Sequence, residues 1–146
     1  MLHKETVSPE LFRLIQDLCG HPELDNFVLV GGTALSLQIG HRKMDHINFF
    51  SIANFASEQM SEFLTSKYDF KIHARFKNSL MGILNNIKVD IISHQYKWVT
   101  KVLEEENTRM ARIEDIAAMK FNAIVGNGSR LKDFIDIAFL SSYFSL

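Results

Sequence analysis

Several absences narrow the range of proteins that this chain of 146 residues can be. Its single cysteine, Cys19, excludes an internal disulfide framework and suits a reducing compartment. No apolar run approaches the roughly 20 residues that span a bilayer, and the start of the chain lacks the apolar segment of a signal peptide. These absences predict a cytoplasmic protein that does not enter membranes.

An excess of one charge is also missing. Sixteen Lys and Arg residues stand against 17 Asp and Glu residues, which gives a net charge of −1. A protein that holds a long DNA duplex through its phosphates needs a basic surplus or a basic face, so we expect no binding of long duplex DNA. A small charged ligand or a local RNA end is compatible with this charge balance.

The chain has the composition of one folded domain. Hydrophobic residues make up 47% and charged residues 23% of the sequence, which are ordinary values for a globular protein. Only two prolines occur, both before residue 23, and there is no internal repeat or low-complexity stretch. We therefore predict a single domain over residues 1–146.

Hydrophobic periodicity predicts an α+β fold, in which helices pack on a mixed sheet. A hydroxyl N-cap, Ser8, followed by Pro9 indicates the first helix start, and Asn85-Asn86 is typical of a two-residue hairpin turn. The expected helices are 8–20, 34–39, 55–65, 114–125 and 129–144, and the expected strands are 27–30, 47–51, 68–76, 80–84 and 87–93.

Gly31-Gly32-Thr33 lies between a buried strand and a helix. Glycine lets a ligand approach the backbone, and the free N–H groups of a helix start favour a phosphate. The alternative is a tight turn with Thr33 as the helix N-cap. The sequence His41-Arg42-Lys43 follows one short helix later, and it either brings cations to the same place or is a solvated basic turn.

Three ionisable residues interrupt apolar patterns. Asp90 shares one face of its predicted strand with Lys88 and Ile92, where a carboxylate needs a cationic partner or a metal. Lys120 falls in the apolar stripe of helix 114–125, so it either extends to the helix edge or reaches into a cleft. Asp136 interrupts the last helix and also needs a cationic partner. Trp98 and the scattered phenylalanines are interpreted as packing residues.

The order of these motifs resembles the nucleotidyltransferase domain of the AbiEii/AbiGii-type toxin family, within the polymerase-β-like superfamily. The similar segments are Leu29-Val30-Gly31-Gly32-Thr33-Ala34-Leu35, Gly40-His41-Arg42-Lys43, Lys88-Val89-Asp90-Ile91-Ile92-Ser93, Ile113–Lys120 and Lys132–Ile137. They extend over about residues 27–140. Motifs in the same order over most of the chain are more specific than any one of them.

The resemblance implies a minimal nucleotidyltransferase fold and assigns roles to residues. Gly31, Gly32 and Thr33 match the turn that holds the nucleotide's phosphates, with Arg42 and Lys120 as further nucleotide-binding residues and Asp136 in support. Asp90 matches the third metal-binding carboxylate. The implied cofactors are Mg²⁺ and a nucleoside triphosphate, and the implied partners are RNA or a cognate antitoxin protein.

The sequence departs from the family at the metal site. Where the family has Asp-x-Asp, this chain has His46-Ile47-Asn48, so two of three metal carboxylates are replaced. Asp45 is adjacent, but a shift of one residue along a strand places its side chain on the opposite face. Because Mg²⁺ prefers oxygen ligands, a site with Asp90 as its one carboxylate should bind the metal pair poorly.

Three hypotheses follow. The chain is a degenerate family member that binds nucleotide or a partner without catalysis, which the metal argument favours. Alternatively, it is an active metal-dependent enzyme that moves a nucleoside monophosphate to an RNA end or a protein hydroxyl. In the third, it holds no ligand and acts only as a subunit. The motif order further predicts that strands 27–30, 47–51 and 87–93 lie side by side and place His46, Asn48 and Asp90 around one cleft.

Overall fold

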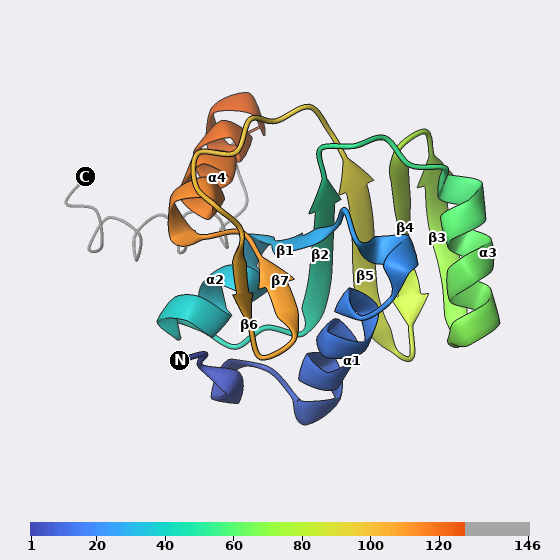
Figure 1. Ribbon diagram of the computed structural model, residues 1–146, viewed down its shortest axis with the longest axis horizontal. Helices are drawn as coiled ribbons and strands as arrows, with labels where there is room; N and C mark the ends of the chain where they lie inside the picture. Colours follow the sequence, from blue (N-terminus) through green and yellow to red (C-terminus); the bar gives the residue numbers. More distant parts are fainter. Residues whose placement is uncertain (128–146) are drawn as a thin grey trace.

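The computed structural model describes the backbone of residues 1–127 and the side chains of residues 1–120. This part of the chain forms helices packed on one seven-stranded sheet (Figure 1). The helices are α1 (Pro9–Cys19), α2 (Gly31–Ile39), α3 (Ser57–Lys67) and α4 (Ile113–Asn127). The strands are β1 (Val28–Val30), β2 (His46–Ser51), β3 (Phe70–Phe76), β4 (Ser79–Leu84), β5 (Ile87–Ser93), β6 (Leu103–Glu105) and β7 (Thr108–Met110).

The sheet is mixed, as predicted, and its order is β3-β4-β5-β2-β1-β7-β6. Strands β2 and β5 pair in parallel at the centre, and β1 runs antiparallel along the other side of β2. The outer strands β3 and β4 form an antiparallel meander with β5. No helix in the described part of the chain combines the length and the apolar character needed to cross a bilayer.

The two faces of the central strands differ in burial. Residues on one face, such as Ile47 and Phe49 of β2, are almost completely buried in a core shared with α1 and α3. On the other face the side chains of β2 are only half-buried. We call this second side of β2, β5, β4 and β3 the open face. It carries the candidate site.

The first helix forms where the sequence predicts it. The Ser8 hydroxyl accepts a hydrogen bond from the backbone N–H of Leu11 at 3.1 Å, and Pro9 occupies the first helical position. This cap satisfies a donor that the helix itself leaves unpaired, and proline at this position needs no N–H partner. The helix ends at Cys19, whose side chain is buried in the core.

The Asn85-Asn86 hairpin is confirmed. Leu84 of β4 pairs with Ile87 of β5, and the two asparagines between them have φ angles of +49° and +68°. Asparagine tolerates this left-handed backbone better than other residues with a side chain do, so the dipeptide fixes the register of the hairpin. That register also fixes where Asp90 lies in the sheet.

The sequence analysis missed the hairpin of β6 and β7. Each strand has three residues, too few for an alternating pattern, and the intervening Glu106 and Asn107 have φ angles of +51° and +63°. Strand β7 pairs in parallel with β1, which places this hairpin beside the centre of the sheet. The predicted helix over 129–144 lies outside the described residues.

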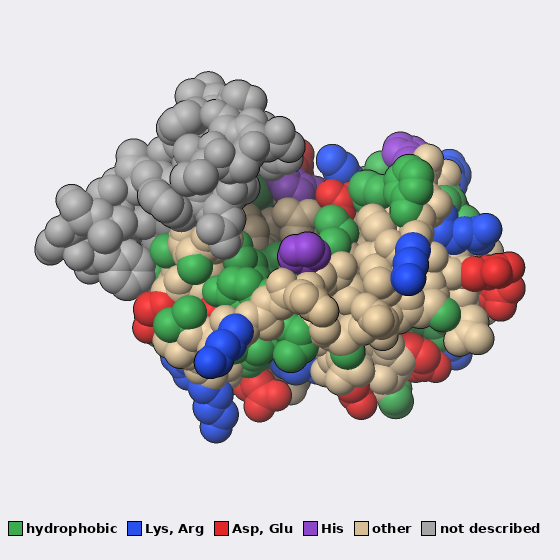
Figure 2. Space-filling view, turned by 90° about the horizontal axis from the view of Figure 1, so that it is seen from above, with side chains coloured by type: hydrophobic (Ala, Val, Ile, Leu, Met, Phe, Trp, Pro, Cys, Tyr) green, Lys and Arg blue, Asp and Glu red, His purple; other side chains and the backbone are tan. Residues whose placement is uncertain are grey.

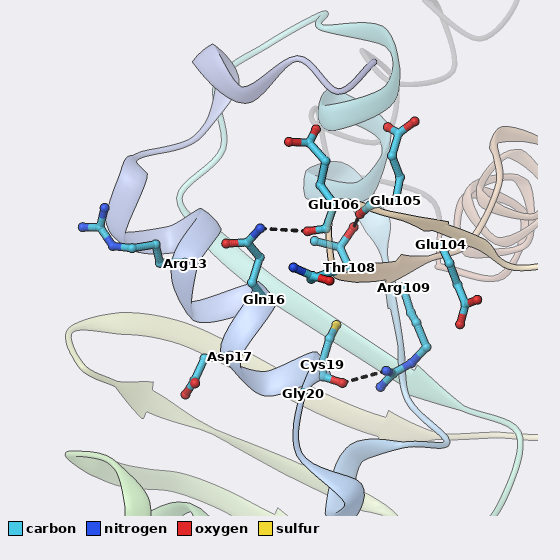
Figure 3. Close-up of a pocket in the computed structure, with 11 residues that line it drawn as sticks. Arg13, Gln16, Asp17, Cys19, Gly20, Glu104, Glu105, Glu106, Thr108 and Arg109 are labelled. Carbon is cyan, nitrogen blue, oxygen red and sulfur yellow. Dashed lines mark hydrogen bonds between the residues drawn. The ribbon is translucent and has the colours of Figure 1, made fainter.

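Arg109 fastens β7 to the segment that follows α1. Its guanidinium donates to the backbone carbonyls of Cys19, Leu24 and Phe27 at 2.8, 2.7 and 3.2 Å (Figure 3 shows the contact with Cys19). One side chain therefore donates to three backbone carbonyls of this segment, of which that of Leu24 also accepts from the N–H of Phe27 at 2.9 Å. Hydrogen bonds from a charged donor are stronger than those from a neutral one.

We expect Arg109→Met to lower the free energy of unfolding by about 2–4 kcal/mol, because it leaves three carbonyls without their charged donor. Urea denaturation followed by circular dichroism measures this change. Arg112→Met is the matched control, since the Arg112 Nε donates to one exposed carbonyl, that of Lys101. A loss no larger than in the control would contradict the role assigned to Arg109.

Candidate functional site

Asn48 and Asp90 are direct neighbours on the open face. The parallel pairing of β2 and β5 puts Asn48 opposite Asp90 and His46 opposite Lys88, without a break in register. Cross-strand partners point to the same side of a sheet. The prediction that β1, β2 and β5 lie side by side is confirmed, and Asn48 and Asp90 share one face of the sheet. That these residues surround a cleft stays a prediction.

The carboxylate of Asp90 is incompletely hydrogen-bonded among the described residues. Its Oδ1 is a buried side-chain oxygen without a hydrogen-bond partner in the part of the chain that the structure describes. Leaving a buried acceptor unpaired costs about 1–3 kcal/mol, and more if the group is charged. Most buried polar groups have a partner, and a bound ion or a catalytic role is among the explanations for one that has none. Asp90 is therefore the residue of the open face with the clearest capacity to bind.

The glycine turn lies against Asn48. Gly31 has a φ of +73°, and a Cβ atom there would come within 2.8 Å of Asn48 Nδ2. A Cβ atom on Gly32 would come within 2.6 Å of Arg42 Nη2. Glycine is thus required at Gly31 for both conformation and space, and the turn fits between an amide and a guanidinium. A phosphate at this turn would meet both groups.

The Thr33 side chain does not cap helix α2 and instead contacts β2. The side chain is 1% exposed, and its hydroxyl donates to the backbone carbonyl of His46. Helix α2 already begins at Gly31 with Val30 as N-cap residue, so the interpretation of Thr33 as N-cap is wrong. The hydroxyl instead joins the first turn of α2 to the start of β2. The N–H groups of that first turn have no acceptor within the helix.

The basic turn is partly folded onto the site. Arg42 Nη1 lies 2.7 Å from the Met44 sulfur, and the Ser36 hydroxyl lies 3.3 Å from His41 Nδ1. Arg42 and His41 are half-buried, while Lys43 is exposed. Only Lys43 fits the interpretation of a solvated turn. The proximity of Arg42 to Gly32 places one permanent cation beside the glycine turn.

Asp45 does not replace the missing carboxylates. It precedes β2, its side chain is 95% exposed, and one carboxylate oxygen lies 3.3 Å from His46 Nδ1. The continuous register of β2 with β5 contains no bulge that would turn Asp45 toward Asp90. His46, with 15% of its side chain exposed, occupies the first family position itself.

Lys120 faces inward, as its position in the apolar stripe predicts. It is 8% exposed and lies on α4, which packs against α2, the helix that carries the glycine turn. A cation this deeply buried requires polar partners, and Lys120 has at least one. Asp136 lies outside the described residues, so its pairing with Lys120 stays a prediction.

The segment before β6 is held in place by Asp115, which lies in the first turn of α4. The structure shows it 1% exposed. Its carboxylate accepts hydrogen bonds from the Tyr96 hydroxyl, the Val99 N–H, and both the N–H and the hydroxyl of Thr100. Four donors explain how a carboxylate stays buried near the N-terminus of α4. An Asp in a first helical turn was the available signal.

These hydrogen bonds make stability depend on pH. Burial alone would raise the pKa of Asp115, but the donors from Thr100, Val99 and Tyr96 lower it below its ordinary value. A lowered pKa stabilises the fold above the unfolded value of about 3.9, and this contribution is lost as the pH falls below it. We expect Asp115→Asn to cost about 1.5–3 kcal/mol at pH 7 and less at pH 3. Urea titrations at both pH values measure the difference, and an equal cost at both would contradict it.

A pocket of about 900 Å³ lies elsewhere, between α1 and the β6–β7 hairpin (Figure 3). None of the predicted site residues lines it. Its polar groups serve the fold, since Gln16 donates to the Glu106 carbonyl and Arg109 holds the Cys19 carbonyl. Four acidic side chains line it: Asp17, Glu104, Glu105 and Glu106. Two cations, Arg13 and Arg109, also line it, so the acidic side chains outnumber the basic ones and the pocket suits a phosphate less well than the glycine turn does.

The donors at the family's metal positions do not suit a pair of magnesium ions. They are one carboxylate, one amide and one imidazole, from Asp90, Asn48 and His46. Magnesium requires near-octahedral oxygen ligands, and imidazole nitrogen suits zinc or copper better. Among the described side chains, no group of three or more His, Cys, Asp or Glu residues could hold a metal ion. The metal pair implied by the resemblance does not fit these residues.

The described surface seen from above the view of Figure 1 carries side chains of both charges. Figure 2 shows Lys and Arg side chains as well as Asp and Glu side chains, mainly along the margins of this view. This view agrees with the net charge of −1. The cations that matter for a phosphate are therefore local, and Arg42 beside Gly32 is the best placed of those described.

Known structures resemble this architecture over 92% of the chain. The Megavirus polyadenylate synthase matches with a TM-score of 0.62 at 16% identity. The antibiotic-resistance factor ANT(2'')-Ia matches with 0.60 at 13% identity. The chain has the nucleotidyltransferase fold. JHP933 from Helicobacter pylori matches this fold too, with a TM-score of 0.62 at 20% identity. Identities this low establish the fold and not the reaction.

A similar sequence occurs in Aquifex aeolicus (strain VF5). The uncharacterized protein aq_aa25 is 33% identical over 125 residues, which cover 80% of this chain. The match spans 58% of that protein, and the structural matches span 32% of the polyadenylate synthase and 65% of JHP933. No protein-family model matches the chain. The nucleotidyltransferase fold is therefore shown, while the toxin subfamily stays a prediction.

Proposed function

We propose that this chain binds a nucleoside triphosphate on a nucleotidyltransferase fold whose metal site is too degenerate for nucleotidyl transfer. The observation that carries the proposal is the row formed by Asn48 and Asp90 beside the glycine turn at Gly31. This row keeps the position of the family's metal ligands but presents only one carboxylate. The fold and the glycine turn for the phosphates remain, but two of the three carboxylates that would hold two divalent cations are replaced.

The same substitutions favour binding of a phosphate without a metal. A family site with three carboxylates repels a triphosphate until divalent cations neutralise it. Here Asn48 is neutral and lies against Gly31, and the guanidinium of Arg42 lies over Gly32. The unpaired N–H groups of the first α2 turn add donors and the positive end of the helix dipole. These groups can bind a triphosphate directly.

The finer assignment rests on the motif order. We propose that the chain is a component of the AbiEii/AbiGii type, in which the nucleotide-binding domain also contacts a cognate antitoxin protein or an RNA. The runner-up is an active enzyme that transfers a nucleoside monophosphate to an RNA end or a protein hydroxyl. Asp90 supports it, because the unpaired Oδ1 is a suitable ligand for a single cation.

Calorimetric titration of ATP in the presence of EDTA tests the binding. We expect measurable affinity, reduced roughly 10-fold or more by Arg42→Gln, because a charged hydrogen bond contributes about 1.5–3 kcal/mol. Lys120→Met should weaken binding as well if the inward lysine reaches the phosphates. Lys67→Gln, at the far end of α3, is the control that should leave affinity unchanged. Equal affinities of native and Arg42→Gln protein would contradict this phosphate site.

A further inference from the structure

Three aromatic side chains meet next to the Asn48–Asp90 row. The ring of Phe50 lies 6.1 Å from Tyr96 and 5.9 Å from Trp98, and Tyr96 lies 5.3 Å from Trp98, measured between ring centroids. All three pairs are edge-to-face, with interplanar angles of 77–90°. The three residues are half-buried, so the cluster is neither part of the closed core nor freely solvated. We call it the aromatic wall.

The aromatic wall belongs to the open face. Phe50 follows Asn48 by two residues on β2, so it shares the side of the sheet on which Asn48 lies. Its cross-strand partner on β5 is Ile92, which is 39% exposed. Phe50 and Ile92 therefore form an apolar row about 6.6–6.8 Å from the polar row of Asn48 and Asp90. The apolar row is therefore adjacent to the polar row that lies beside the glycine turn.

The loop that supplies the other two rings is held in place. Tyr96 donates its hydroxyl to Asp115, and Val99 and Thr100 donate backbone N–H groups to the same carboxylate. These bonds fix the loop on both sides of Trp98 before any ligand arrives. Preorganised aromatic groups bind with little loss of conformational entropy. The aromatic wall is therefore preorganised for a ligand.

We propose that Phe50, Tyr96 and Trp98 form the base-binding wall of the nucleotide site and favour a purine. This inference rests on the proposed function, since the triphosphate must sit at the glycine turn for its base to reach Phe50. Every nucleobase has a flat apolar surface that stacks on aromatic rings, at about 1–3 kcal/mol per base. A purine presents the larger ring area. Exposed Ile92 supplies further apolar contact beside Phe50.

The competing explanation is structural. A small satellite cluster of aromatic residues can simply hold the 94–100 loop on the sheet. In that case the rings contribute to stability, and a triphosphate binds equally well with or without a base. The two explanations differ in one measurable quantity, which is the affinity that the base adds to the phosphates.

Trp98 provides the readout, because it is the only tryptophan of the chain. Native protein is titrated in EDTA with ATP, UTP and inorganic tripolyphosphate, following Trp98 fluorescence and calorimetric affinity. We expect ATP to bind at least 10-fold more tightly than tripolyphosphate and more tightly than UTP, and to change Trp98 emission in a way that tripolyphosphate does not. Equal affinities for ATP and tripolyphosphate would overturn the proposal.

Two variants separate stacking from stability. Phe50→Leu keeps an apolar side chain and should lower ATP affinity about 10-fold, by removal of an aromatic contact, without changing tripolyphosphate affinity. Phe76→Leu is the control, since Phe76 is 64% exposed on the same face but at β3. If Phe50→Leu does not fold, the comparison of ligands on native protein still decides. If neither ATP nor tripolyphosphate binds native protein, the proposed function is wrong. If both bind with equal affinity, only the proposal that the aromatic wall binds the base is wrong.

Discussion

The double variant His46→Asp with Asn48→Asp is expected to acquire metal-dependent stability that the native chain lacks. In EDTA its melting temperature should fall below the native value, because two added carboxylates repel Asp90 across one parallel strand pair. With ATP and Mg²⁺ the melting temperature should rise by roughly 5–10 °C, since ligand at 100 times its Kd contributes about 2.7 kcal/mol. Differential scanning calorimetry measures both changes.

A triple variant provides the matched control for this gain. Adding Asp90→Asn to the double variant removes the third carboxylate, so the metal-dependent rise should largely disappear. Native protein should show a rise with ATP that is the same in Mg²⁺ and in EDTA. If the double variant gained nothing from Mg²⁺, the three positions would not form a metal site even when their carboxylates are restored, and the degenerate-site account would lose its basis.

Gly31→Ala is expected to lower both the stability of the fold and the affinity for ATP. Its φ of +73° costs an alanine about 1–2 kcal/mol, and the new Cβ would lie 2.8 Å from Asn48 Nδ2. The turn must shift away from β2, which moves its N–H groups away from the phosphate position. We expect about 1–3 kcal/mol of destabilisation and at least a 10-fold loss of ATP affinity, measured by urea denaturation and calorimetry.

Two other glycines make this test specific. Gly32→Ala meets Arg42 Nη2 at 2.6 Å, the movable end of a long side chain, so it should weaken ATP binding with little loss of stability. Gly20→Ala has an ordinary φ of −83° and a closest contact of 3.4 Å, so both properties should stay near native values. Native-like ATP affinity in Gly31→Ala and Gly32→Ala would show that the turn does not hold phosphates.

Much of the fold could be predicted because its signals are local. The cap at Ser8, the apolar strand before Gly31 and the Asn85-Asn86 turn each depend on a few adjacent residues, and the structure confirms them. The motif order predicted that the strands of Asn48 and Asp90 lie side by side, and the parallel pairing of β2 with β5 confirms it.

What the sequence could not show depends on contacts between distant segments. Strands β6 and β7 are too short for a pattern, and they exist because β7 pairs with β1 and Arg109 reaches three distant carbonyls. Asp115 resembles an exposed first-turn acid until the 94–100 loop folds over it. The packing interpretation of Trp98 and Phe50 likewise gave no sign that both lie beside Asn48 and Asp90.

Transfer of labelled nucleotide is the most direct test of the central claim. Native protein is incubated with labelled nucleoside triphosphates, Mg²⁺ or Mn²⁺, and RNA, and both the RNA and the protein are examined for label. The account predicts no transfer to either acceptor, because Asp90 alone does not hold the two cations that stabilise the transition state. Robust Mg²⁺-dependent transfer by the native protein, abolished by Asp90→Asn, would contradict the degenerate-site account and establish the enzyme instead.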